Sequence, residues 1–226
     1  KQRVMGLALG YEDLNDHDTL RHDPLLALLS DRQDLSGKTR KRDQDKGCAL
    51  AGKSTLNRLE LTPLDADAAS RYKKIVADPE GMDDLLVDLF LEAHDTAPAE
   101  IILDVDATDD PLHGNQEGRF FHGYYRSYCY LPLYIFCGEH LLCARLRKAD
   151  QDGAAGTVDE LARIIERIRL SWPQTRIIVR GDSGFCRDEL MAWCEAHGVD
   201  YVLGLAKNSR LKTAIAAELL EAKVQY

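Results

Sequence analysis

The sequence predicts an α/β fold in which a mixed sheet is flanked by helices and preceded by a helical N-terminal region. Up to residue 97 the apolar residues recur with helical spacing. From residue 98 onward, short β-rich runs alternate with amphipathic stretches in the order β-β-β(-β)-α-β-α-β-α. Closely spaced strands with short polar breaks pair antiparallel, whereas strand–helix–strand units give parallel neighbours. We therefore divide the chain into a helical region at 1–97 and a sheet domain at 98–226.

Two stretches carry the helix signals of the first region. Asp23 followed by Pro24 is typical of a helix start, with the aspartate capping the first turn and the proline at the first helical position. Further along, a group of apolar residues follows i, i+3, i+4, i+7, i+8 spacing: Met82, Leu85, Leu86, Leu89 and Phe90. This spacing predicts one buried face of a helix.

The sheet domain contains β-rich runs separated by helical stretches. The runs lie at 101–106, 120–125, 131–137, 141–146, 176–181 and 199–205. Thr157-Val158-Asp159-Glu160 has the form of a capping box that opens a helix. A second helix contains Leu190 and is closed by Gly198, and the spacing of Leu211, Ile215 and Leu219 predicts a final helix.

Composition and charge limit the function classes. The chain has 226 residues, of which 45% are hydrophobic and 30% charged, as in soluble globular proteins. It has no apolar run of about 18 residues and no secretory signal, so we expect a cytoplasmic protein without a membrane partner. Its six cysteines form no Cys-x-x-Cys pair and are expected to be free thiols rather than zinc ligands.

Aspartates follow two of the apolar runs at the point where each run ends. Ile101-Ile102-Leu103 leads into Asp104 and Asp106, and Ile177-Ile178-Val179 leads towards Asp182. A carboxylate beside a hydrophobic core needs a cation or hydrogen bonds, and oxygen ligands suit Mg²⁺ or Mn²⁺. We therefore predict that Asp106 and Asp182 hold divalent ions, with Asp104 as a further candidate because strand alternation puts it on the same side as Asp106. The alternative, that these aspartates only cap turns at strand ends, stays open.

Four polar pieces surround or precede these aspartates. They are Gly10 to Asp18, Leu103 to Asp110, His113 to Gly118 and Arg180 to Phe185. In this order and spacing they resemble the DDE transposases of bacterial insertion sequences, specifically the thirteen-eighty group, over nearly the whole chain. The resemblance implies a ribonuclease H-like catalytic domain that uses three acidic residues and two divalent ions to nick DNA and join the freed 3′ hydroxyl to a target. It also implies that Asp106, in an Asp-x-Thr strand end, is the first catalytic acid and Asp182 the second.

The third acid of such enzymes, a glutamate on a helix after a strand-rich insertion, has no match in this chain. Glu218 and Glu221 lie on the last predicted helix, where their surroundings resemble a solvated face. The chain also opens at Lys1, with no methionine before Met5. We therefore expect a C-terminally truncated piece of a longer transposase that is catalytically incomplete by itself. Its expected partners are transposon-end and target DNA and, in a homodimer, the full-length protein. A non-catalytic DNA-binding fragment is the alternative.

A rival interpretation uses the same opening stretch. An apolar run followed by Asp104-x-Asp106-x-Thr108 also resembles the haloacid dehalogenase-like phosphotransferases, in which Asp104 would be the nucleophile and Asp106 the acid/base. Two observations count against it. Antiparallel strands rather than a helix are predicted to follow the motif, and Asp188 is spaced too far from Asp182 for the Mg²⁺-binding loop of those enzymes.

Basic residues are concentrated in one stretch of the first region. Between Ser36 and Arg58, seven basic residues stand against two acidic ones, although the whole chain has a net charge of −9. We expect these basic residues to contact the DNA backbone, with a merely solvated loop as the alternative. They are Lys38, Arg40, Lys41, Arg42, Lys46, Lys53 and Arg58.

Two further patterns are given structural rather than functional interpretations. Gly47 to Ser54 matches the Walker A pattern letter for letter, but no strand is predicted before it, so we do not expect nucleotide binding. A group of tyrosines follows the first strand and is expected to pack between strands rather than to stack on bases. These tyrosines are Tyr124, Tyr125, Tyr128 and Tyr130.

Overall fold

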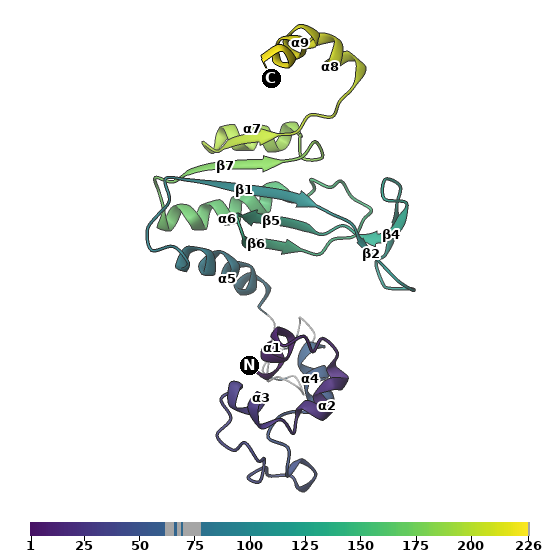
Figure 1. Ribbon diagram of the computed structural model, residues 1–226, viewed down its shortest axis with the longest axis vertical. Coiled ribbons are helices and arrows are strands. Elements are labelled where there is room, and N and C mark those ends of the chain that lie inside the picture. Colours follow the sequence, from purple (N-terminus) through teal and green to yellow (C-terminus); the bar gives the residue numbers. More distant parts are fainter. Residues whose placement is uncertain (62–65, 67–68, 70–77, 226) are drawn as a thin grey trace. The chain divides into compact units, whose positions relative to one another are not determined.

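The computed structural model describes residues 1–61, 66, 69 and 78–225. Contacts divide the chain into two compact units, Lys1–Asp78 and Pro79–Tyr226 (Figure 1). The boundary between these units precedes the helix that contains Met82, whereas the predicted domain boundary lay at residue 97. The predicted division itself stays a prediction, and each unit is described separately below.

The first unit is helical. Its helices are α1 (Gln2–Ala8), α2 (His17–Leu20), α3 (Pro24–Leu29) and α4 (Lys53–Glu60), with 3₁₀ turns at Leu14–Asp16 and Asp43–Asp45. Helix α3 begins as predicted, because the Asp23 carboxylate accepts hydrogen bonds from the backbone N–H groups of Leu25 and Leu26 at 2.7 and 3.0 Å. A small core holds the unit together and consists of Leu20, Leu26, Ala27, Ala49 and Leu50.

A five-stranded mixed sheet forms the centre of the second unit. Its strands are β1 (Glu100–Ala107), β5 (Leu133–Cys137), β6 (His140–Arg145), β7 (Arg176–Gly181) and β8 (Asp200–Leu203). They lie in the order β6-β5-β1-β7-β8. Strand β5 is antiparallel to β1 and β6, whereas β7 is parallel to β1 and β8. This arrangement confirms the predicted fold class, a mixed α/β sheet flanked by helices.

Helices cover one face of this sheet. They are α5 (Pro79–Glu92), α6 (Thr157–Ser171) and α7 (Asp188–Ala196). In β1, Ile101, Leu103 and Val105 are at most 5% exposed and belong to the core that these helices complete. The alternating residues, including Asp104 and Asp106, are half-buried or exposed. The sheet therefore has a covered face and a more open face, and the predicted aspartates lie on the open one.

A second, three-stranded sheet was not predicted. It consists of β2 (Asp110–Pro111), β4 (Ser127–Tyr130) and β3 (Phe120–His122), in the order β2-β4-β3. The run at 120–125 was predicted as one strand, but it turns after His122, and Arg126 adopts a left-handed φ of 56° before β4 begins. Figure 1 shows this small sheet beyond the carboxyl end of β1. Tyr124 and Tyr128 are 84% and 48% exposed, so the expectation that the tyrosines pack between strands was wrong for these two.

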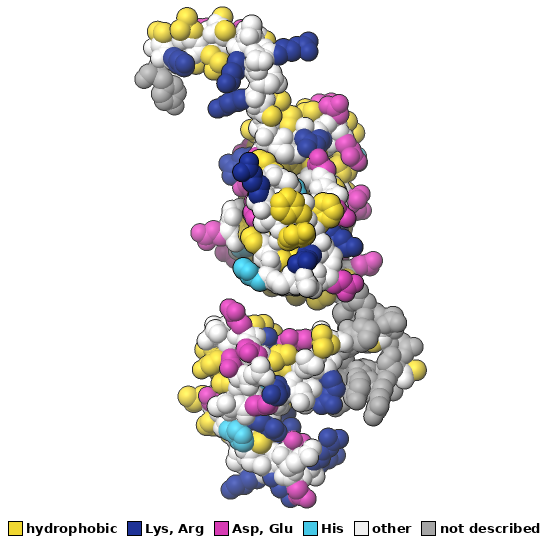
Figure 2. Space-filling model, turned by 90° about the vertical axis from the view of Figure 1, so that its right-hand side faces the viewer, with side chains coloured by type: hydrophobic (Ala, Val, Ile, Leu, Met, Phe, Trp, Pro, Cys, Tyr) yellow, Lys and Arg dark blue, Asp and Glu magenta, His cyan; other side chains and the backbone are white. Residues whose placement is uncertain are grey.

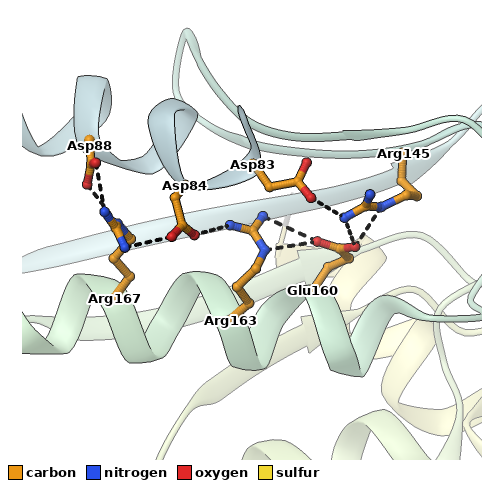
Figure 3. Close-up of polar contacts among 7 residues, drawn as sticks. All are labelled: Asp83, Asp84, Asp88, Arg145, Glu160, Arg163 and Arg167. Carbon is orange, nitrogen blue, oxygen red and sulfur yellow. Dashed lines mark hydrogen bonds and ion pairs between the residues drawn. The ribbon is translucent and has the colours of Figure 1, made fainter. Parts of the chain in front are cut away.

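The prediction for helix α5 was right about the helix and about Phe90, which is buried, and wrong about most of the predicted buried face. Met82, Leu85 and Leu89 are 56%, 52% and 53% exposed, whereas Val87 and Phe90 are buried. The side of α5 that faces α6 carries aspartates instead. Figure 3 shows them in contact with arginines of β6 and α6. The members of this α5–α6 charge network are Asp83, Asp84, Asp88, Arg145, Glu160, Arg163 and Arg167.

The same network explains why the predicted capping box was wrong. Gly156, with a left-handed φ of 73°, is the last residue before helix α6. No side chain caps the first turn of this helix. Glu160 instead accepts a hydrogen bond from Arg145 Nε at 2.8 Å and from Arg163 Nη2 at 3.2 Å. A carboxylate that is needed between two guanidinium groups is not available to cap a helix.

The last part of the described chain is helical. The single predicted helix is two helices, α8 (Ser209–Ala214) and α9 (Ala216–Gln225), separated at Ile215. None of the described residues of either helix is buried. No helix among the described residues is long and apolar enough to cross a membrane.

Candidate active site at the carboxyl ends of strands β1 and β7

The pairing of β1 with β7 brings the two predicted acids to neighbouring positions. In this parallel ladder Val105 pairs with Gly181, so Asp106 is the next residue of β1 and Asp182 is the first residue after β7. Both residues are exposed. Because side chains alternate along a strand, Asp104 and Asp106 project from the open face of the sheet.

The three aspartates differ in what compensates their charge. Both oxygens of Asp104 accept hydrogen bonds from the Arg180 guanidinium, its pair in the ladder, at 2.5 and 2.8 Å. Among the described residues, Asp182 accepts a hydrogen bond only from the backbone N–H of Gly184, at 2.7 Å through Oδ1. Asp106 makes no side-chain hydrogen bond or ion pair with any described residue. A cation at Asp104 would have to displace a guanidinium, whereas Asp106 and Asp182 are available.

Gly181 and Gly204 lie where the chain around Asp182 comes too close to other atoms for a side chain to fit. Gly204 N–H donates to the Gly181 carbonyl at 2.9 Å, which ties the end of β8 to the end of β7. A Cβ at Gly204 would lie 2.8 Å from Ser183 N and 3.0 Å from the carbonyl carbon of Asp182. A Cβ at Gly181 would lie 2.8 Å from a methyl group of Val105. These approaches fix the loop that carries Asp182 against strands β1 and β8.

Tyr125 lies close enough to Asp106 and Asp182 for their negative charges to affect its pKa. Its hydroxyl donates to the Ala107 carbonyl at 3.4 Å, directly after Asp106. Burial raises the pKa of this tyrosine, and the negative charges of Asp109, Asp106 and Asp182 raise it further. The edge of the sheet therefore has a concentration of negative charge that a cation would offset.

Two arginines that the sequence analysis did not identify bind the loop that contains Asp152, Gly153 and Ala155. Arg147, buried to 9% exposure, donates to the carbonyl oxygens of Leu131, Gly153 and Ala155. Arg187, beyond Asp182, pairs with Asp152 at 2.9 Å and lowers the pKa of that carboxyl. A Cβ at Gly153 would lie 3.7 Å from that of Ala107. This loop therefore lies next to Ala107 and borders the candidate site.

Alternation could have identified one further residue. Arg180 stands two positions before Asp182, as Asp104 stands two before Asp106, so parallel pairing predicts that Arg180 and Asp104 meet. No comparable signal in the sequence points to Tyr125, Asp152 or Arg147, because their positions depend on how loops return to the sheet.

The donor set at this edge fits a hard divalent ion but does not complete a site. Unpaired carboxylate oxygens are the ligands that Mg²⁺ and Mn²⁺ prefer, with water filling the remaining positions. Within the described residues, no group of three or more His, Cys, Asp or Glu side chains could hold a metal ion. That Asp106 and Asp182 are ligands stays a prediction.

The predicted DNA-contacting residues belong to the first unit and differ in their pairing. Lys46 pairs with Asp43, Lys53 pairs with Asp18, and Arg58 is exposed. Four others have no ion pair with any described residue: Lys38, Arg40, Lys41 and Arg42. The loop that holds them is ordered by Asp34, whose carboxylate accepts hydrogen bonds from Ser36 and Thr39, and these bonds hold its pKa well below the usual range.

The Walker A match has a structural explanation. Residues 1–61 contain no strand, so the glycine-rich segment does not follow one. The first N–H of helix α4, that of Lys53, is bound by the Asp18 carboxylate at 3.0 Å. A carboxylate of the chain thus occupies the position where a phosphate would bind in a nucleotide-binding loop.

Comparison with known proteins gives a family for the chain. The model of the family "Transposase DDE domain group 1" matches residues 1–226, and no curated protein matches. Among solved structures, the catalytic domain of Mos1 mariner transposase aligns with a TM-score of 0.34 and 12% identity over 65% of this chain and 70% of that one. A piggyBac transposase synaptic complex with hairpin DNA aligns at 0.36 and 12%, over 85% of this chain and 53% of that one. Because the family model spans the whole sequence, the chain belongs to the DDE transposases.

Proposed function

We propose that this protein contributes the first two acids of a metal-dependent DNA phosphoryl transferase, which cleaves and joins strands at the ends of a bacterial insertion sequence of the thirteen-eighty group. The observation that supports the proposal is the parallel pairing of Val105 with Gly181, the residues that directly precede Asp106 and Asp182. Neither aspartate has a neutralising side chain among the described residues. Two neighbouring carboxylates repel each other, and a bound divalent cation would offset that repulsion.

Each residue has a distinct part in this proposal. Asp106 and Asp182 hold Mg²⁺ or Mn²⁺, which, when bound, activates the attacking oxygen and stabilises the leaving oxygen at phosphorus. Asp104 stays paired with Arg180 and keeps that guanidinium on the same face as the acids. The Gly181–Gly204 contact holds the backbone of Asp182 in place.

The proposal requires a third acid, because the resemblance implies a mechanism with three acidic residues, of which Asp106 and Asp182 match the first two. We therefore propose that the 226 residues are incomplete for catalysis and that an added glutamate-bearing segment completes them. The basic loop with Lys38, Arg40, Lys41 and Arg42 contributes contacts to DNA phosphates, which do not depend on the base sequence.

Strand cleavage tests the proposal. The chain, extended by the glutamate-bearing segment of a thirteen-eighty transposase, should nick DNA that carries the matching insertion-sequence ends when Mg²⁺ is present, and Asp106→Asn or Asp182→Asn should abolish nicking. Asp95→Asn, an exposed aspartate on the loop before β1, is the matched control and should nick as the unaltered chain does. Nicking that persists in Asp106→Asn would contradict the proposal.

A small phosphate ester separates this function from the phosphotransferase alternative. Hydrolysis of p-nitrophenyl phosphate that is lost in Asp104→Asn would identify Asp104 as a nucleophile. We expect no such hydrolysis, because both Asp104 oxygens are held by Arg180 and strands rather than a helix follow β1.

A further inference from the structure

A cavity in the first unit is lined by basic and neutral residues. It has a volume of about 350 Å³, and its charged lining residues are Lys1, Arg32 and Arg40. No acidic residue lines it within the described part of the chain. Figure 2 shows Lys and Arg side chains at the lower end of this unit, where Figure 1 places the loop between α3 and α4. The composition of this cavity suits an anion.

Another cavity of the same unit has a different charge balance. It has a volume of about 480 Å³ and lies beside α4. Its lining contains two cations, Arg3 and Lys53, and three carboxylates, Glu12, Asp13 and Glu60. Arg3 also forms an ion pair with Glu60. An excess of positive charge is therefore particular to the cavity with Arg32 and Arg40, and is not a general property of the first unit.

The two guanidinium groups of the cationic cavity lack a carboxylate partner. Arg32 Nε donates to the Ala49 carbonyl at 3.2 Å, and neither Arg32 nor Arg40 forms an ion pair with any described residue. Lys1, by contrast, is paired with Asp31. Arg40 is half-buried, although the other unpaired basic residues of its loop are exposed. A partly buried cation without a counter-charge favours an anionic ligand.

A buried hydroxyl supplies a further hydrogen-bond donor. Ser30 directly follows the last residue of α3 and lines the same cavity. Its Oγ is buried and has no hydrogen-bond partner among the described residues. A buried hydroxyl in this state costs free energy, which an acceptor oxygen of a ligand would recover. Guanidinium and hydroxyl groups together are the donors that suit phosphate oxygens.

We propose that this cavity binds one phosphate of the DNA backbone, to which Arg32, Arg40 and Ser30 donate. The inference rests on the proposed function, since it takes DNA to be the partner of the chain. It adds Ser30 and Arg32, neither of which was predicted to contact DNA, and it separates Arg40 from the exposed residues of its loop. Such a contact positions the duplex without reading its bases.

The salt dependence of DNA binding tests the proposal, because it counts the phosphates that the protein neutralises. Binding of the 226-residue chain to two fluorescein-labelled duplexes of unrelated sequence is followed by anisotropy at several NaCl concentrations in EDTA. Arg40→Gln should weaken binding to both duplexes and reduce the slope of log K against log [NaCl] by about 1. Arg40→Lys, which keeps the charge, should keep the slope.

The buried hydroxyl provides a second variant. Ser30→Ala should weaken DNA binding by about 2- to 12-fold, the range of one hydrogen bond. Its melting temperature should not fall, because the hydroxyl has no partner within the described protein. Arg210→Gln, on exposed helix α8, is the control and should keep both the affinity and the salt slope.

Dimethyl phosphate, a model of one backbone phosphate, separates the cavity from the surface of the loop. In ¹⁵N NMR its addition should shift the Nε–H signals of Arg32 and Arg40 and leave that of Arg42, an exposed arginine of the same loop outside the cavity, unchanged. Equal shifts of Arg40 and Arg42, or an unchanged salt slope in Arg40→Gln, would overturn the phosphate cavity while leaving the proposed function intact. Tighter binding of inorganic phosphate than of dimethyl phosphate, with unchanged DNA affinity in Arg40→Gln, would identify a site for free phosphate and also overturn it. Failure of the unaltered chain to bind any DNA would overturn both.

Discussion

Two regions of the second unit use the same residue type in opposite ways. In the α5–α6 charge network, every carboxylate meets at least one guanidinium: Asp88 lies 2.7 Å from Arg167, and Asp83 lies 2.7 Å from Arg145 (Figure 3). At the carboxyl ends of β1 and β7, Asp106 has no partner among the described residues and Asp182 has only a backbone N–H. The difference separates carboxylates that hold the fold together from carboxylates available to a ligand.

Asp104 is an intermediate case and shows that position in the sheet alone does not decide whether a carboxylate is available to a ligand. It shares a strand and a face with Asp106, yet its charge is neutralised by Arg180. Pairing, rather than proximity to the site, is therefore the criterion that distinguishes the carboxylates of this sheet edge.

The largest effect is expected at the unpaired acids. Asp106→Asn or Asp182→Asn should lower the affinity for Mn²⁺, measured by electron paramagnetic resonance, by at least about 10- to 100-fold, the loss typical even for residues outside the first ligand shell. The free energy of unfolding without metal should stay within about 0.5 kcal/mol, because no ion pair is lost. Asp104→Asn should change Mn²⁺ affinity less. A fall in stability without a change in Mn²⁺ affinity would place Asp106 with the structural carboxylates.

The next effect tests the backbone that carries Asp182. Gly204→Ala should lower the free energy of unfolding by about 1–3 kcal/mol, because its methyl group would meet the backbone of Asp182 and Ser183, which cannot rotate away. Mn²⁺ affinity should fall as well. Gly123→Ala is the control, since a Cβ there meets nothing within 4 Å, and urea unfolding of the two variants measures the difference. Equal stability of both variants would show that the loop adapts.

How much the sequence could predict follows from the range of the interactions involved. Apolar runs predicted strands β1 and β7, and the aspartates at the ends of these runs made Asp106 and Asp182 candidates before the structure; their catalytic role stays a prediction. The Asp23 cap of α3 was predicted correctly for a similar reason, because it depends only on residues up to three positions away.

Features that depend on distant partners could not be predicted in this way. The spacing of Met82, Leu85 and Leu89 indicated a buried face, but α5 turns its aspartates towards arginines about 80 residues away in sequence. Glu160 was read as a cap for the same reason, since its partner Arg145 lies on another element. The small sheet was missed because β2 has only two residues and β3 three, too few for a periodic signal.

Within the charge network, the least exposed carboxylate should matter most. The Glu160 side chain is 13% exposed and lies between Arg145 and Arg163. Glu160→Gln should lower the free energy of unfolding by about 1–2 kcal/mol, because two guanidinium groups lose a charged acceptor. Glu166→Gln, on an exposed position of the same helix, is the control and should change stability little. Urea unfolding checks both, and a stable Glu160→Gln would mean that the network adds nothing to the packing of α5 on α6.

The smallest effect is a pH dependence at the other end of this network. The hydrogen bonds from Arg167 hold the pKa of Asp88 below its usual value. A lowered folded-state pKa gives stability that is present above the unfolded pKa of about 4 and is lost as pH falls through the folded value. The melting temperature of Arg167→Gln should therefore lie below that of the unaltered chain at pH 7, and the two should converge as pH falls below about 4.

Arg210→Gln, on exposed helix α8, is the control and should melt as the unaltered chain does at every pH. A difference between Arg167→Gln and the unaltered chain that stays constant with pH would show that Arg167 stabilises the helix pair through its aliphatic stem, and the contrast between paired and available carboxylates would then rest on Glu160 alone.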